Sequence, residues 1–160
     1  MRRLVAPALL SLVALLGRPG TAPAAVPAAA PNYQAPVDAS IADPFRPPAH
    51  RYGPGNLGVD YATRPGQPVR AAAPGVVTFA GAVGAARHVV VGHADGIRTT
   101  YAFLGRVLVR AGTAVGAGEV VGEAGHRPLH FGARAGPAYV DPQILLAGPG
   151  PPRARLLPDG

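Results

Sequence analysis

The segment RHVVVGHADGIRTTYAF, residues 87–103, decides the fold that the sequence predicts. Two runs rich in β-branched residues, 87–93 and 97–103, flank the triplet Ala94-Asp95-Gly96. An Asp-Gly pair between two such runs is a strong hairpin signal, because glycine adopts a positive φ without steric cost. The segment therefore predicts two antiparallel strands that are neighbours in a sheet.

The same two-residue period continues outward from this hairpin in short pieces. Residues 76–80, VVTFA, are bounded by Pro74-Gly75 and Gly81 and predict another strand. From 112 to 122 a glycine recurs every few residues between valines, as short strands joined by tight reversals require. Only 142–146 suggests a helical turn. The expected class is all-β, an antiparallel sandwich of short glycine-separated strands.

Composition limits the function classes. The chain has 160 residues, of which 48% are hydrophobic and 14% charged, as expected for one domain with one core. The formal net charge is +7, yet there is no basic run and no alternation of arginine with aromatic residues, so nucleic acid is not an expected partner. The absence of cysteine excludes thiolate zinc sites and disulfides.

The ends of the chain differ from its middle. Residues 1–24 are expected to be a signal peptide, with Met1-Arg2-Arg3, an apolar stretch and a cleavable Ala22-Pro23-Ala24. We expect an exported protein without stable membrane insertion after cleavage; an uncleaved leader acting as an anchor is the alternative. Residues 25–44 predict an Ala/Pro-rich linker, 45–146 the domain and 147–160 a disordered tail.

Several blocks between 45 and 146 occur in the order typical of one enzyme family. They resemble the lysostaphin-type, or LytM-like, zinc metallopeptidases, which cut peptide cross-bridges in bacterial cell walls. The blocks are Gly58-Val59-Asp60, Gly66-Gln67-Pro68-Val69-Arg70-Ala71, Gly75-Val76-Val77, Gly92-His93, Thr100-Tyr101-Ala102-Phe103-Leu104, the glycine-valine series up to Gly122, Leu129-His130-Phe131 and Asp141-Pro142. Biotin- and lipoyl-carrier domains share the glycine-valine spacing, but they attach their cofactor to a lysine and this chain has none.

The resemblance implies a zinc site that has lost part of its ligand set. The family uses two histidines and an aspartate, with a fourth position open for water. The matching positions hold Asn56, Asp60 and His130, and an amide oxygen is a poorer zinc ligand than imidazole. Asp60 and His130 are therefore expected to be a relict metal site, and no cofactor is expected.

Two further family histidines, which orient the water and stabilise the transition state, match Phe103 and Pro128. Neither side chain can exchange a proton. The resemblance places both of them, together with Tyr101, along the former substrate groove. Alternatives remain open: Tyr101 as a packed strand tyrosine, Asp60 as a turn aspartate and His130 as a packed core histidine.

Other histidines are weaker candidates for the missing ligand. His126 lies four residues before His130, but the intervening Pro128 and the preceding Gly125 favour an exposed loop. His50 is expected to face solvent. His88 and His93 have opposite parity in one strand and should point to opposite faces, with His93 in a structural hydrogen-bonding role.

The expected function is that of a secreted, wall-associated domain without peptidase activity, which binds peptidoglycan or regulates a wall hydrolase. Degenerate members of the family are known to activate wall amidases, so a regulatory role is one implication of the resemblance. The alternative is an active zinc metalloendopeptidase that cleaves peptidoglycan peptide bonds with Asp60, His130 and His126. A structural wall protein is the third hypothesis.

Overall fold

The computed structural model describes residues 31–50, 53–148 and 154–155. In chain order the elements are β1 (Ile41–Asp43), β2 (Gly58–Tyr61), β3 (Pro68–Arg70), β4 (Gly75–Val83), β5 (Ala86–Gly92), β6 (Ile97–Val107), β7 (Ala114–Val115), β8 (Val120–Ala124), β9 (Leu129–Ala135), β10 (Ala138–Val140), α1 (Pro142–Leu146) and β11 (Ala154–Arg155). The predicted all-β class is confirmed, and the predicted single helical turn is α1. No helix within these residues is long and apolar enough to cross a bilayer.

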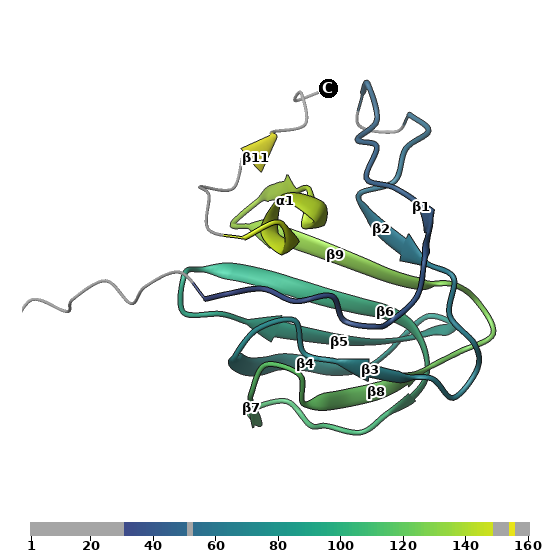
Figure 1. The fold of residues 1–160 in the computed structure, drawn as a ribbon, viewed down its shortest axis with the longest axis vertical. Helices are drawn as coiled ribbons and strands as arrows, with labels where there is room; N and C mark the ends of the chain where they lie inside the picture. Colours follow the sequence, from purple (N-terminus) through teal and green to yellow (C-terminus); the bar gives the residue numbers. More distant parts are fainter. Residues whose placement is uncertain (1–30, 51–52, 149–153, 156–160) are drawn as a thin grey trace, which may run out of the picture.

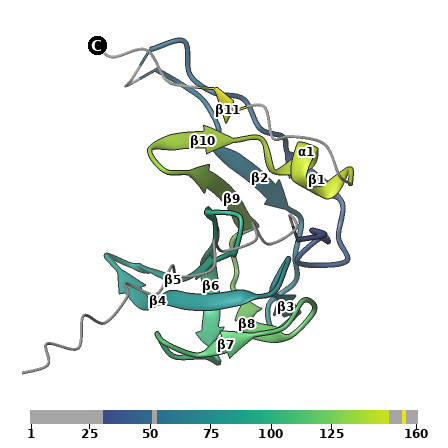
Figure 2. The same ribbon diagram turned by 90° about the vertical axis from the view of Figure 1, so that its left-hand side faces the viewer.

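Seven strands lie side by side in the order β1-β2-β9-β6-β5-β4-β7, and every pairing among them is antiparallel (Figure 1). β6 changes partner along its length, because its first part pairs with β9 while residues from Leu104 onward pair with β8. β8 in turn pairs with β3. Seen from the side, β7 and β8 lie below β4, away from β2, β9 and β10 (Figure 2).

One core lies inside this folded sheet. Its largest completely buried side chains come from β2, β3, β4, β5, β6, β8, β9 and β10, and they include Val59, Val69, Val77, Val89, Tyr101, Val121, Leu129, Phe131 and Val140. The alternation predicted for residues 87–103 is present, since buried and more exposed residues follow one another along β5 and β6. This packing holds β2, β9 and β6 in fixed register.

His93 is part of this core. It is buried, its Nδ1 lies 2.8 Å from the carbonyl oxygen of Pro74, and its Nε2 lies 2.8 Å from Thr99 Oγ1. Thr99 Oγ1 is 3.1 Å from the hydroxyl of Tyr101, which accepts a hydrogen bond from the Ala72 amide. A carbonyl only accepts, so Nδ1 carries a proton. The predicted structural role of His93 is confirmed.

The linker predicted for residues 25–44 is wrong from residue 31 onward. Tyr33 and Val37 are buried in the core, and the Tyr33 hydroxyl donates to both carboxylate oxygens of Asp95, at 3.1 and 3.0 Å. Residues 41–43 form β1, which pairs with β2. Aromatic and β-branched residues within the Ala/Pro-rich stretch explain the error, because they supply apolar surface that the sheet buries. The proposed signal peptide at 1–24 lies outside the described residues.

The disordered tail predicted for residues 147–160 also needs a correction. Ala154–Arg155 form β11, which pairs with β10 (Figure 2). The backbone pairing supplies the order that the Pro/Gly/Arg composition did not predict. The other residues beyond 148 lie outside the described part of the chain.

Candidate functional site

Four neighbouring strands bring the candidate site together. His88 on β5 pairs with Ala102 on β6, Ala102 pairs with His130 on β9, and His130 pairs with Asp60 on β2. Directly paired residues of an antiparallel sheet project from the same face. We call these four residues the cross-strand row. Its register confirms the expectation that His130 lies on a strand beside Asp60.

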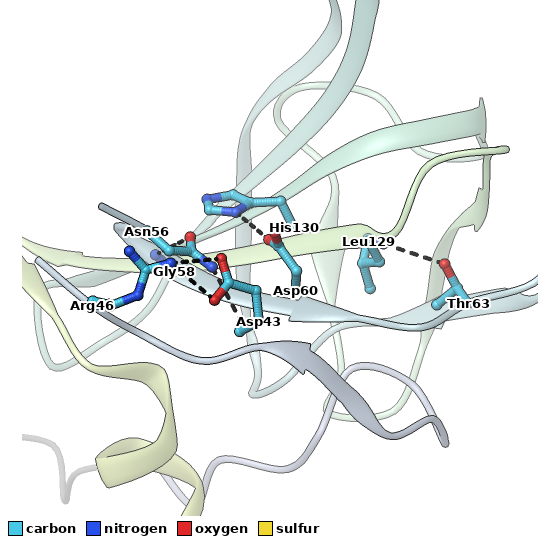
Figure 3. A network of polar contacts seen from close by, with 8 residues as sticks. All are labelled: Asp43, Arg46, Asn56, Gly58, Asp60, Thr63, Leu129 and His130. Atoms are coloured by element: carbon cyan, nitrogen blue, oxygen red, sulfur yellow. Dashed lines mark hydrogen bonds and ion pairs between the residues drawn. The ribbon is translucent and has the colours of Figure 1, made fainter. Parts of the chain in front are cut away.

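Asp60 and His130 contact each other directly. His130 Nδ1 lies 2.7 Å from Asp60 Oδ1, and the two side chains are 25% and 29% exposed (Figure 3). This distance is typical of a hydrogen bond to a carboxylate. The start of β9 is fixed nearby, because the Leu129 amide donates to Thr63 Oγ1 at 3.2 Å. The relict pair is therefore held by hydrogen bonds within the protein.

Asn56, at the third ligand position, is committed to the backbone around it. The residue is buried; its Nδ2 donates to the Asp43 carbonyl, and its Oδ1 accepts from the Gly58 amide, each at 3.2 Å (Figure 3). Its own backbone pairs with Arg46 in an isolated bridge. The amide thus joins the chain before β2 to the end of β1, and its oxygen is already engaged.

Phe103, at the position of a family histidine, has an unusual backbone. Its φ is 65°, and no other non-glycine residue has a positive φ among the described residues. Such a conformation is costly for a bulky side chain. Its ring centroid is 6.3 Å from that of His88 and 6.4 Å from that of His130. The guanidinium carbon of Arg127 lies 3.7 Å from the ring centroid, in cation–π contact.

Pro128 and His126 lie in the loop that joins β8 to β9. Both are exposed, as is Arg127 between them. Pro128 directly precedes β9, where its missing N–H removes no ladder hydrogen bond. Exposure of His126 agrees with the predicted loop.

Tyr101 does not line a groove. Its side chain is completely buried, with its ring centroid 5.4 Å from that of Phe131, and burial raises the pKa of its hydroxyl to about 12. The alternative, a packed strand tyrosine, describes it correctly. Conversely, the sequence analysis missed that His88 shares the face of His130. Burial lowers the pKa of His88, and the nearby His130 lowers it further.

The residues present do not fit the zinc ligand set that the resemblance implies. Asp60 and His130 supply two ligands, but the oxygen of Asn56 accepts a hydrogen bond from Gly58. Within residues 31–50, 53–148 and 154–155, no three His, Cys, Asp or Glu side chains are grouped to hold a metal ion. A catalytic zinc needs three protein ligands. The site as built is a hydrogen-bonded pair beside an aromatic ring and arginines.

The chain resembles known proteins over most of its described length. The sequence model of Peptidase family M23 matches residues 54–142. An uncharacterized protein of Mycobacterium tuberculosis is 40% identical over 131 residues, covering 68% of this chain and 52% of that protein. The DD-carboxypeptidase/endopeptidase Mpg of Neisseria meningitidis is 39% identical over 103 residues, covering 60% of this chain and 24% of the enzyme.

Solved structures agree with this assignment. Csd3 of Helicobacter pylori superposes with a TM-score of 0.64 at 25% identity, over 78% of this chain and 35% of Csd3. The chain thus spans about half the length of its mycobacterial relative and less of the others. The matched region, residues 54–142, contains all four members of the cross-strand row together with Asn56, Phe103 and Pro128. The chain belongs to Peptidase family M23.

Proposed function

We propose that this chain is an exported, wall-associated M23 domain that binds peptidoglycan, or regulates a wall hydrolase, without cutting peptide bonds. One observation carries the proposal: of the five positions at which the family holds ligands and proton-handling histidines, only Asp60 and His130 keep suitable side chains, and they are hydrogen-bonded to each other. The domain keeps the scaffold of the family around a changed centre.

The chemistry of the remaining side chains supports the absence of cleavage. Peptide hydrolysis needs an activated water and a proton donor for the leaving amine. Phe103 and Pro128 can perform neither step. Loss of a general base alone costs roughly 10²–10⁴ in rate. The loss of a zinc ligand at Asn56 adds to this deficit, because the family's water nucleophile depends on the metal.

Two observations support the wall as the target. A relative that is 39% identical over 103 residues is named DD-carboxypeptidase/endopeptidase, and the family that the motifs resemble cuts peptides of the bacterial cell wall. The formal net charge of +7 falls to +4 once Arg2, Arg3 and Arg18 of the expected leader are removed, and this remaining positive charge favours contact with an anionic polymer. Regulation of a hydrolase is the second form of the same proposal, with the former substrate face as the contact surface.

The first test measures zinc and cleavage in the purified protein. We expect far less than one zinc per chain by elemental analysis and no hydrolysis of muropeptides. The triple variant Asn56→His, Phe103→His, Pro128→His should gain zinc, since it restores three good ligands. The same triple variant with His130→Ala is the matched control and should not gain zinc. Stoichiometric zinc in the unmodified protein, lost on His126→Ala, would establish the alternative metalloendopeptidase instead.

The second test measures binding to the wall itself. The protein should co-sediment with purified peptidoglycan sacculi and remain soluble without them. Without an amidase, the protein should leave the sacculi intact. Stimulated release of muropeptides by the amidase would identify the regulatory form of the proposal. Failure both to sediment and to stimulate would refute both forms.

A further inference from the structure

A pocket of about 460 Å³ adjoins the candidate site. It lies between the turn that joins β4 to β5, the end of β6 around Phe103 and the loop before β9. Its ionisable lining residues are Arg87, His126 and Arg127, and no Asp or Glu lines it. Small apolar residues, among them Ala85 and Ala86, form another part of the lining. The lining thus combines basic side chains with small apolar ones.

The two arginines are held in position by different contacts. Arg127 lies flat against a ring, with its guanidinium carbon 3.7 Å from the Phe103 centroid. Within the described part of the chain, it has no side-chain hydrogen bond or ion pair, so its N–H edge is free for a ligand. Arg87 donates one hydrogen bond to the Gly105 carbonyl at 3.0 Å and keeps its other donors. Both guanidinium groups therefore combine fixed placement with unused N–H donors.

We propose that this pocket binds a carboxylate of a short peptide, with Arg127 as the principal donor and Arg87 as the second. The proposal rests on the wall-binding function and adds the group that is recognised: a free carboxylate of the wall's peptide part, held by these two arginines. A planar guanidinium matches a carboxylate with two parallel hydrogen bonds. The alanines beside it accommodate a small aliphatic side chain of the same peptide.

The position of Phe103 links the pocket to the cross-strand row. Arg127 lies against its ring, and His130 approaches the ring at 6.4 Å in an edge arrangement. The Phe103 ring therefore connects the pocket to the face on which Asp60 and His130 lie. Phe103 thus replaces a proton-handling group with a platform that orients a binding arginine.

The test is calorimetric titration of the full chain with a soluble muropeptide that carries free carboxylates. Arg127→Ala should weaken binding about tenfold, the loss expected for one hydrogen-bonded charged group. Arg127→Lys keeps the charge but loses the planar fork, so it should be intermediate. Arg98→Ala is the matched control, because it removes the same charge from an exposed position at the other end of β6 and should not change affinity.

Two ligand arms test the chemistry of the occupant. A muropeptide with amidated carboxylates should bind the unmodified protein as weakly as the free acid binds Arg127→Ala. Inorganic phosphate should compete poorly. The inference is overturned if amidation has no effect, if Arg98→Ala weakens binding as much as Arg127→Ala, or if phosphate competes as well as the muropeptide.

Sedimentation with sacculi separates this inference from the wall-binding proposal. If Arg127→Ala and Arg87→Ala together sediment like the unmodified protein, the wall proposal stands and the carboxylate pocket is refuted. If the protein does not sediment with sacculi yet binds the muropeptide through Arg127, the carboxylate pocket is established and the wall-binding proposal is refuted. If it binds neither, both are refuted.

Discussion

His93 directly follows β5 and His130 lies on β9, and the surroundings of the two side chains differ. His93 is 7% exposed, both its ring nitrogens have partners, and the ring of Tyr33 approaches it edge-on at 5.2 Å. The side chain of His130 is 25% exposed and uses one nitrogen for Asp60. The first histidine completes a closed network, whereas the second lies on an accessible face.

This difference separates residues that stabilise the fold from residues that are available to bind a ligand. A buried polar group without a partner is costly, so each member of the His93 network depends on the others. A partly exposed pair exchanges protein contacts for water at little cost. We therefore expect loss of the His93 side chain to affect folding, and loss of the His130 side chain to affect binding.

The largest expected effect concerns a glycine beside each histidine. A Cβ on Gly75 would lie 2.4 Å from the Gly92 carbonyl oxygen, and one on Gly58 would lie 2.5 Å from that of Phe131. Because both obstacles are backbone atoms, Gly75→Ala and Gly58→Ala should each cost about 3 kcal/mol, measured by urea unfolding. Gly81→Ala, with only ordinary contacts, is the control. Unequal costs would show that the backbone is less rigid at one histidine.

His93→Ala should cost about 2–3 kcal/mol. It leaves the Pro74 carbonyl and the Thr99 hydroxyl without their partner inside the core. Urea unfolding at pH 7 measures the change. A cost below about 1 kcal/mol would mean that water reaches the network, and the contrast with His130 would disappear.

Acidification from pH 7 to pH 5 should reduce stability. Burial lowers the pKa of His93 below its ordinary 6.5, although the Pro74 carbonyl and the charge of Asp95 oppose this. The unfolded chain therefore takes up protons first, and the stability present above pH 6.5 is lost as the pH falls through the folded pKa. His88 acts in the same direction. Urea midpoints across this range should show a shallower slope for His93→Asn; stability that increases on acidification would contradict the assignment.

The smallest effect is expected at the relict pair. His130→Ala and Asp60→Asn should each change the free energy of unfolding by less than about 1 kcal/mol, because solvent screens a partly exposed pair. The same urea series supplies the measurement. If His130→Ala lowers the free energy of unfolding as much as His93→Ala, His130 is a core histidine and does not differ from His93 in its role.

The fold was predictable because its signals are local. Alternation and the turn at Asp95-Gly96 lie within residues 87–103, and β5 and β6 follow them closely. The N-terminal segment was not predictable from composition, since Tyr33 and Val37 gain their burial from strands distant in sequence. A few apolar residues in an Ala/Pro-rich stretch carry no sign of which surface will bury them.

The site was predictable only in part, for a related reason. Asp60 and His130 came from motif order, and their pairing depends on the β2–β9 register that the family scaffold fixes. His88 pairs with Ala102 in the regular β5–β6 register, but its place on the face of His130 also depends on the pairing of β6 with β9, two strands that are distant in sequence. The roles of Asn56 and Arg127 depend on side-chain contacts, which no spacing in the sequence encodes.

Because of the backbone conformation of Phe103, restoring a histidine should have opposite effects on stability at residues 103 and 56. Histidine occurs at positive φ several times more often than an average residue, so Phe103→His relieves strain at a φ of 65°. Asn56→His instead discards two hydrogen bonds to Asp43 and Gly58. Substitution by histidine thus stabilises the fold at residue 103 and destabilises it at residue 56. Asn56 is therefore the position that most opposes restoration of the family's histidines.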